Sequence, residues 1–183
     1  METGEETVKK ELLFIETKRL QIMEWSEELA DAVYTISQDE SNRQYLPDEV
    51  FESADEAQEW IRELLNNRET GEGSQVFPVL LKTGKLIGHV GICPLEDWNE
   101  KAWEIEYHIS ETHRRQGYAV ETVNAFVPII MERFHLHNLR GFCPQEHTAS
   151  VRVMERCGFH KYREKDVRYY GKPTRLLYYI YEE

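Results

Sequence analysis

The sequence is poor in cysteine, in long apolar runs and in positive charge. Its three cysteines, Cys93, Cys143 and Cys157, form no C-x-x-C pair, so we expect buried thiols in a reducing compartment and no disulfide framework. No run of about eighteen apolar residues is present, which predicts no membrane-spanning helix. The opening M-E-T-G-E-E-T-V-K-K has no apolar segment, so no secretory signal is expected. These absences predict a cytoplasmic protein.

Acidic residues dominate the charge, with 34 Asp and Glu against 22 Lys and Arg and a formal net charge of −12. Such a balance argues against a nucleic-acid partner, whose phosphates would be repelled. The charge is uneven, because residues 1–138 carry a net −15 and residues 139–183 a net +3. An acidic front and a basic end suit a domain that binds an amine on one side and a phosphorylated cofactor on the other. Solvated faces on an ordinary soluble protein explain the same charge equally well.

The most informative stretch runs from Trp103 to Phe134. Residues 103–110 alternate between apolar and polar side chains, which is typical of a half-buried strand. From Val120 the apolar residues recur every three or four positions, which predicts an amphipathic helix, although Pro128 interrupts it. The expected apolar positions of the helix are Val123, Phe126, Val127, Ile130, Met131 and Phe134.

The segment E-T-H-R-R-Q-G-Y-A joins this strand to this helix. A helix start carries unpaired backbone N–H groups and the positive end of the helix dipole. Gly117 and Ala119 place no bulk over these donors, and Arg114 and Arg115 add positive charge. The junction therefore predicts a pyrophosphate cradle. An ordinary turn with solvated arginines is the alternative interpretation.

Several motifs in this region resemble the GNAT N-acetyltransferases, in particular their RimJ/RimL-type branch. Arg114-x-x-Gly117-x-Ala119 is similar to the acetyl-CoA signature R/Q-x-x-G-x-G/A, and it follows E-I-E-Y as in the family. E-T-K-R-L-Q-I resembles the opening strand of that branch, and residues 147–159 resemble its N-x-x-S-x-x-V-x-x-x-x-G-F segment. The likeness covers roughly residues 15–165 and keeps the order of the motifs.

The resemblance implies that acetyl-CoA lies against the central strand, with its pantetheine arm adding to that strand and its pyrophosphate at the helix entrance. It implies no metal, and His135 and His137 have no further ligand at suitable spacing. The residues implied to bind the cofactor are Tyr107, His108, Ile109, Arg114, Arg115, Gln116, Gly117, Tyr118, Ala119, His147 and Ser150.

Turn and helix-capping signals predict the remaining strands and helices along the chain. The predicted order is β-α-α-β-β-β-α-β-α-β-β, a mixed α/β (α+β) single GNAT-type domain over residues 1–183, with a central mixed sheet of about six to seven strands and about four helices. Residues 1–13 are expected to be loosely ordered. Residues 39–52 are expected to form a loop beside the acceptor pocket. Ser53-x-x-Glu56 predicts a capped helix that ends near Gly71.

Deprotonation of the acceptor amine is the first catalytic requirement. A lysine-like amine with a pKa of about 10.4 is almost wholly cationic at neutral pH, so a general base helps the attack. Glu104 matches the acidic residue of the family's E-I-G-Y motif and is the predicted base. Glu106 replaces the glycine of that motif on the same strand face, and mutual repulsion would raise one pKa. Solvent exposure of either glutamate remains an equally good interpretation.

Departure of the thiolate is the second requirement. Many members of the family use a tyrosine as the acid, at a position occupied here by Met154. The RimJ/RimL-type branch lacks it, so the resemblance assigns Ser150 as the second catalytic residue, donating to the thiolate. His147 replaces the asparagine of the motif, and when protonated it would attract phosphates.

The predicted function is therefore transfer of an acetyl group from acetyl-CoA to a primary amine, in a ternary complex. The acceptor is a protein N-terminus or a small amine, and the protein is expected to be a monomer or homodimer without nucleic-acid or membrane partners. The alternative is a CoA-binding sensor or interaction module without turnover.

Overall fold

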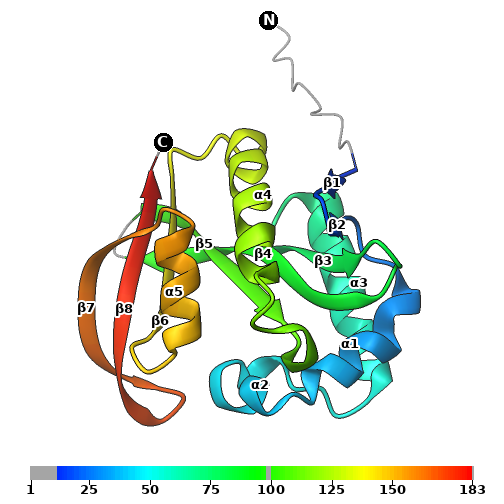
Figure 1. The fold of residues 1–183 in the computed structure, drawn as a ribbon, viewed down its shortest axis with the longest axis horizontal. Helices are drawn as coiled ribbons and strands as arrows, with labels where there is room; N and C mark the ends of the chain where they lie inside the picture. Colours follow the sequence, from blue (N-terminus) through cyan, green and yellow to red (C-terminus); the bar gives the residue numbers. More distant parts are fainter. Residues whose placement is uncertain (1–11, 98–99, 183) are drawn as a thin grey trace, which may run out of the picture.

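The computed structural model describes residues 12–97 and 100–182, which form one eight-stranded sheet with helices on both faces (Figure 1). The strand order is β1-β2-β3-β4-β5-β6-β8-β7, and only β5 and β6 pair in parallel. The strands are β1 (Ile15–Glu16), β2 (Leu20–Ile22), β3 (Gln75–Leu81), β4 (Leu86–Asp97), β5 (Glu100–Ile109), β6 (Asn138–Pro144), β7 (His160–Tyr169) and β8 (Lys172–Glu182).

Five α-helices and three short 3-10 helices connect these strands in the described residues. The α-helices are α1 (Ala30–Ser37), α2 (Glu40–Tyr45), α3 (Ala54–Thr70), α4 (Tyr118–Arg133) and α5 (Thr148–Arg156). The 3-10 helices are η1 (Glu27–Leu29), η2 (Pro47–Glu49) and η3 (Glu111–His113). Among the described residues, no helix is long and apolar enough to cross a membrane.

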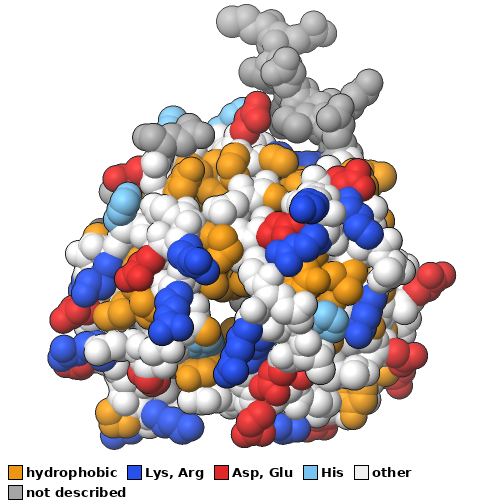
Figure 2. Space-filling view, viewed as in Figure 1, with side chains coloured by type: hydrophobic (Ala, Val, Ile, Leu, Met, Phe, Trp, Pro, Cys, Tyr) orange, Lys and Arg blue, Asp and Glu red, His pale blue; other side chains and the backbone are white. Residues whose placement is uncertain are grey.

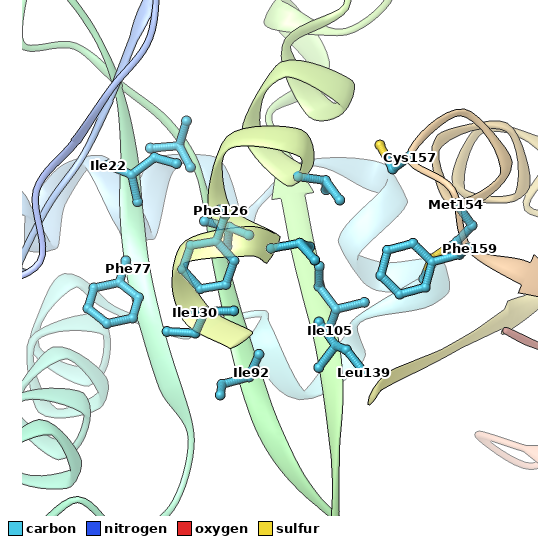
Figure 3. Close-up of a cluster of buried hydrophobic side chains, with 14 of the residues drawn as sticks. Ile22, Phe77, Ile92, Ile105, Phe126, Ile130, Leu139, Met154, Cys157 and Phe159 are labelled. Carbon is cyan, nitrogen blue, oxygen red and sulfur yellow. The ribbon is translucent and has the colours of Figure 1, made fainter. Parts of the chain in front are cut away.

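Side chains alternate between the two faces of β4 and β5 and contribute to a separate hydrophobic core on each face. One side of β5 packs under α4 and α5, where Ile105 and Phe126 are buried (Figure 3). The other side of the sheet packs under α1 and α3, around Trp25 and Ile61. The α4 positions predicted from periodicity are buried except Phe134, which is partly buried, and the helix continues through Pro128.

The predicted counts of about six to seven strands and four helices were too low. The additional strand is β1, whose two residues pair with β2 and are too few for a visible period. The additional helix is α2, which lies inside the predicted loop over residues 39–52. Its sequence E-S-N-R-Q-Y has no apolar stripe, and its one buried residue is Asn42, so periodicity could not reveal it.

The helix α3 confirms the prediction from capping signals. The Ser53 hydroxyl accepts the Glu56 N–H at 3.2 Å, and Gly71 ends the helix in the left-handed conformation with φ of 74°. The expectation of loose order over residues 1–13 falls mainly outside the described residues. Leu13, which is described, is buried, and its N–H donates to the Glu24 carboxylate at 2.7 Å.

Candidate active site

The two parallel strands β5 and β6 diverge at the centre of the sheet. Their ladder contains the single pair Glu104 and Arg140, whereas β5 stays paired with β4 up to Ile109. In the described part of the chain, Tyr107, His108 and Ile109 have no ladder partner on the β6 side. Figure 2 shows a hollow in the face between α4 and α5, with Lys and Arg side chains around it. The predicted cofactor strand thus borders an open cleft.

The entrance of α4 has the form expected of an anion site. Gly117 is the N-cap, and no side chain caps the helix, so its first N–H groups remain available. The φ of Gly117 is 81°, and an added Cβ would meet only Arg19 Nη2 at 3.5 Å. Backbone conformation, rather than lack of space, therefore requires glycine here. Arg115 also has a positive φ, of 61°.

Arg114 lies elsewhere than predicted. Its Nε donates to the Ile109 carbonyl at 2.7 Å, and its Nη2 donates to the Ser41 hydroxyl at 2.5 Å. The guanidinium is therefore tied to the end of β5 and to α2, and its charge does not lie over the α4 entrance. A role of Arg114 in binding the pyrophosphate stays a prediction.

Arg19 occupies the α4 entrance instead. Its Nη1 donates to the Gln116 carbonyl at 2.8 Å, and its guanidinium lies 4.3 Å from the ring centroid of Tyr118. An ion pair with Glu121 at 2.5 Å holds it there. The sequence analysis missed this role because Arg19 and Gln116 are 97 positions apart, although Arg19 belongs to the E-T-K-R-L segment that carries the family likeness.

Ser150 lies in the first turn of α5 and contacts the central strand. Its Oγ is 2.9 Å from the Tyr107 hydroxyl, so the side chain of Tyr107, and not only its backbone, belongs to the site. The Cys143 thiol is also within hydrogen-bonding reach of Ser150. Met154, at the position of the tyrosine acid found in other members, is buried in the core and has no acidic proton.

His147 caps α5. Its Nδ1 accepts the Ser150 N–H at 3.1 Å, so the histidine performs the capping role of an asparagine. Burial lowers its pKa, which keeps the ring neutral at neutral pH. The attraction of phosphates by a protonated His147 stays a prediction, and the lowered pKa moves it to more acidic pH. The ring also packs on Tyr45, with centroids 3.9 Å apart, and so joins α5 to α2.

The hairpin of β7 and β8 contacts η2 and β6. The Tyr170 hydroxyl donates to Asp48 at 2.9 Å, and the Tyr169 ring packs edge-on against Phe142 at 6.2 Å. Figure 1 shows the turn of this hairpin near α2. The Tyr169 hydroxyl also lies 3.5 Å from the Tyr45 carbonyl, so the hairpin contacts the end of α2.

Glu104 and Glu106 lie on the face of β5 opposite Tyr107, because side chains alternate along a strand. Burial, followed by the charge of the neighbouring Glu106, raises the pKa of Glu104 to about 8, while a hydrogen bond from the Phe142 N–H opposes the shift. Burial, followed by the charge of Glu49, also raises the pKa of Glu106. Both glutamates are of intermediate exposure, so each carboxyl is partly buried rather than fully solvated.

A further cluster surrounds Glu106. The ligand atoms of Glu49, His89 and Glu106 lie within 4.8 Å of one another, and the Cys93 thiol donates to Glu106 at 2.9 Å. Burial raises the pKa of Glu49 to about 7 and lowers that of His89. Glu49 lies in η2, far from β5 along the chain, so no local motif points to it.

The family model "Acetyltransferase (GNAT) domain" matches residues 19–160. A protein of Bacillus subtilis (strain 168) named "Uncharacterized N-acetyltransferase YnaD" is 29% identical over 150 residues, which are 81% of this chain and 84% of that protein. The fold and site thus define an acyltransferase of mixed α/β architecture. The chain belongs to the GNAT acetyltransferase family and is an acetyl-CoA-dependent acetyltransferase.

Solved structures share this fold. An acetyltransferase of the GNAT family from Bacillus anthracis has a TM-score of 0.76 and 24% identity, with 93% of this chain and 98% of that chain covered. RimL, a ribosomal L7/L12 alpha-N-protein acetyltransferase in complex with coenzyme A, has a TM-score of 0.79 and 18% identity, again over 93% and 98% of the two chains. At these identities the likeness establishes a shared fold.

Proposed function

We propose that this enzyme transfers the acetyl group of acetyl-CoA directly to a primary amine, either a protein N-terminus or a small amine. The observation that carries this proposal is the partly buried carboxyl of Glu104 at the point where β5 and β6 diverge. A carboxyl whose pKa is near 8 is a base strong enough to compete for the proton of an ammonium group.

The two substrates approach from opposite faces of the sheet in this proposal. Acetyl-CoA lies along β5 on the α4–α5 face, beside Tyr107 and Ser150, with its pyrophosphate at Gly117 and Arg19. The acceptor enters on the face that carries Glu104 and Glu106. Both substrates reach the gap between β5 and β6, which favours a ternary complex over a mechanism in which they occupy one pocket in turn.

The reaction then has four steps. The acceptor ammonium loses a proton to Glu104, and the neutral amine attacks the thioester carbonyl carbon. A free backbone N–H of residues 107–109 stabilises the oxyanion. The C–S bond breaks, and the thiolate takes the proton of the Ser150 hydroxyl, which Tyr107 supports. The nitrogen gives its second proton to the Ser150 oxygen, which restores the hydroxyl, and the proton held by Glu104 passes to solvent, so one proton leaves the enzyme for each turnover.

The state of the thiols supports direct transfer over an acetyl-cysteine intermediate. Burial raises the pKa of Cys143 and of Cys157 to about 11, and it raises that of Cys93 strongly. Thiols of this kind stay protonated near neutral pH and are poor nucleophiles. None of the three is therefore suited to carry the acetyl group.

The test combines CoA binding with an acceptor screen. Purified protein would be titrated with CoA, and release of CoA thiol from acetyl-CoA would be followed with peptides of different N-terminal residues and with small primary amines. The proposal predicts CoA binding and turnover with at least one amine. Tight CoA binding without transfer to any amine would favour the sensor or interaction module.

A further inference from the structure

The cluster of Glu49, His89 and Glu106 connects the interior of the acceptor side to its surface. Glu106 lies two residues from Glu104 on the same face of β5, and its ligand atoms lie within 4.8 Å of those of Glu49 and His89. His89 Nε2 is 3.3 Å from the Glu49 carboxylate. The Glu49 side chain is 19% exposed, compared with 10% for His89. Titratable groups therefore connect Glu104, through its electrostatic interaction with Glu106, to the partly exposed Glu49.

A small cavity beside this path holds polar atoms without partners. Its volume is about 20 Å³, and its lining includes Asn42, Glu49, His89 and His108. Asn42 Oδ1 and His108 Nδ1 are buried and have no hydrogen-bond partner in the described chain. His108 Nε2 lies 3.3 Å from Arg114 Nη2, which must be the donor, so the proton of the neutral ring is on the unpartnered Nδ1. A polar cavity of this size has room for one water molecule.

We propose that Glu106, Glu49 and His89 form a proton exit, which takes the proton that the acceptor amine gives up at Glu104 and passes it to solvent at Glu49. This inference rests on the proposed function, because that reaction releases one proton per turnover on the buried side of β5. Glu49 and His89 are positioning residues here, since they act on the acceptor only through Glu106 and Glu104.

Charges around the path suit transient proton storage. The charges that shift the pKa values of Glu49 and Glu106 are those of neighbouring carboxyls and of His89, so the carboxyls repel one another and share protons. Arg114 lies beyond His108, and its charge lowers the pKa of that ring rather than those of the glutamates. The titratable and charged groups that face the path are Asp48 and Glu49 of η2, His89 and Cys93 of β4, Glu104, Glu106 and His108 of β5, Arg114, Arg140 of β6, which pairs with Glu104 in the ladder, and Tyr169 of β7.

The transfer conserves atoms and charge at each step. The ammonium N–H bond breaks and an O–H bond forms on Glu104, which becomes neutral. That proton moves to Glu106 and then to Glu49, directly or through the cavity water and the ring of His89, and each donor regains its starting charge. Solvent or buffer base takes the proton from Glu49. No oxidant, metal or other co-reactant is required.

The first arm of the test needs no acceptor. Infrared spectra of the full chain should contain bands of protonated buried carboxyls at about pH 7, which fade as the pH rises toward about 9. Glu49→Gln and Glu106→Gln should each remove part of this signal. The matched control is Glu52→Gln, which removes an exposed carboxylate from the same loop and should leave the bands unchanged. Wild-type spectra without such bands would overturn the proposal.

The second arm measures turnover with an amine from the acceptor screen. In dilute buffer, Glu49→Gln and His89→Gln should each lower kcat about tenfold, which is less than the loss expected for the base itself, and should enlarge the solvent deuterium isotope effect. Added imidazole, which has no primary amine, should restore kcat because it accepts the proton at the damaged exit. A purely structural role would not respond to buffer. Glu52→Gln should behave as wild type.

Three results would overturn the proton exit. If CoA binds and amines are acetylated while Glu49→Gln and His89→Gln match the control, the exit is absent and the proposed function stands. If no amine is acetylated, the proposed function fails, and the exit fails with it. If Zn²⁺ raises the melting temperature of the wild type but not of His89→Gln, the cluster is a metal site.

Discussion

The Tyr107 hydroxyl lies 2.9 Å from the Ser150 hydroxyl and so links the central strand to the first turn of α5. Burial raises the pKa of Tyr107, which keeps this phenol protonated and able to donate. The pair is placed on the α4–α5 face, where the resemblance positions the thiol of CoA. A hydroxyl chain of this kind can protonate a departing thiolate without a charged acid.

Replacing Ser150 by alanine should lower kcat about tenfold to a hundredfold while CoA affinity changes little, because the lost contact matters mainly as the thiolate departs. Tyr107→Phe should cause a smaller loss, since Ser150 remains. Stopped-flow turnover and CoA titration would measure both effects. Thr148→Ala is the control, because it removes an exposed hydroxyl from the same turn. Equal turnover of Ser150→Ala and the control would exclude the assigned role.

Gly117→Ala should weaken CoA binding and also cost about 1 kcal/mol of stability, because φ of 81° strains any residue with a Cβ. Gly71→Ala separates the two effects. Its φ is 74° and nothing lies within 4 Å of an added Cβ, so it should show a similar stability loss without a change in CoA affinity. Calorimetric titration with CoA and urea unfolding would compare the pair. Unchanged CoA affinity in Gly117→Ala would place the pyrophosphate elsewhere.

His147→Ala should destabilise the protein by about 1 kcal/mol through loss of the α5 cap, whereas His147→Asn should retain most of that stability. The folded-state pKa of His147 is lowered, so the stability that depends on its neutral form is lost as the pH falls below about 6.5. His147→Asn should remove this acid-side loss. Urea unfolding at about pH 5.5 and 7.5 would measure it, and an unaltered pH dependence in His147→Asn would contradict the capping role.

Hydrophobic periodicity and capping motifs predicted the helices whose formation depends on residues close together in the sequence. The period of residues 120–134 predicted α4, and the spacing of Ser53 and Glu56 predicted α3, because each signal lies within a few turns of the element that it governs. The two-residue strand β1 and the polar helix α2 give no such period. They are fixed by tertiary contacts, such as the hydrogen bond from the Glu111 N–H to Asp39.

The residues of the candidate site also divide into those that local sequence motifs indicated and those that only tertiary contacts reveal. Motif spacing indicated Gly117, Ser150 and Glu104, and the structure places them at an open helix entrance, beside Tyr107 and at the strand divergence. Arg19 and Glu49 could not be found in this way, since their partners lie far along the chain. Arg114 was indicated by the motif, but a motif identifies only the residue type and does not predict the direction of its guanidinium.

The partly buried carboxyls should make the protein less stable as the pH rises. Folding raises the pKa of Glu49 to about 7 and that of Glu104 to about 8, so the folded state binds more protons than the unfolded chain. Stability is then greatest below the unfolded value of about 4.3 and falls as the pH approaches about 8. The buried histidines have lowered pKa values, so their contribution to stability falls as the pH decreases below about 6.5. The decline caused by the carboxyls should therefore be clearest above about pH 6.5.

Urea unfolding across this range should show a decline on the order of 1–3 kcal/mol in the wild type, with a shallower decline in Glu104→Gln. The glutamine cannot ionise, so it removes part of the penalty and should raise stability at the alkaline end. Stability that rises with pH above about 6.5 would mean that the carboxyls are ionised without cost in the folded protein.

The pH dependence of kcat/KM, with Glu104→Gln beside the wild type, tests the central claim most directly. A base with a pKa of about 8 predicts that the wild-type rate rises with pH through that value, because only the ionised carboxylate accepts the ammonium proton. Glu104→Gln should keep its CoA affinity and lose about 10²- to 10⁴-fold in rate, without that rise. A glutamine variant that acetylates amines at the wild-type rate, with the same pH profile, would show that Glu104 is not the base.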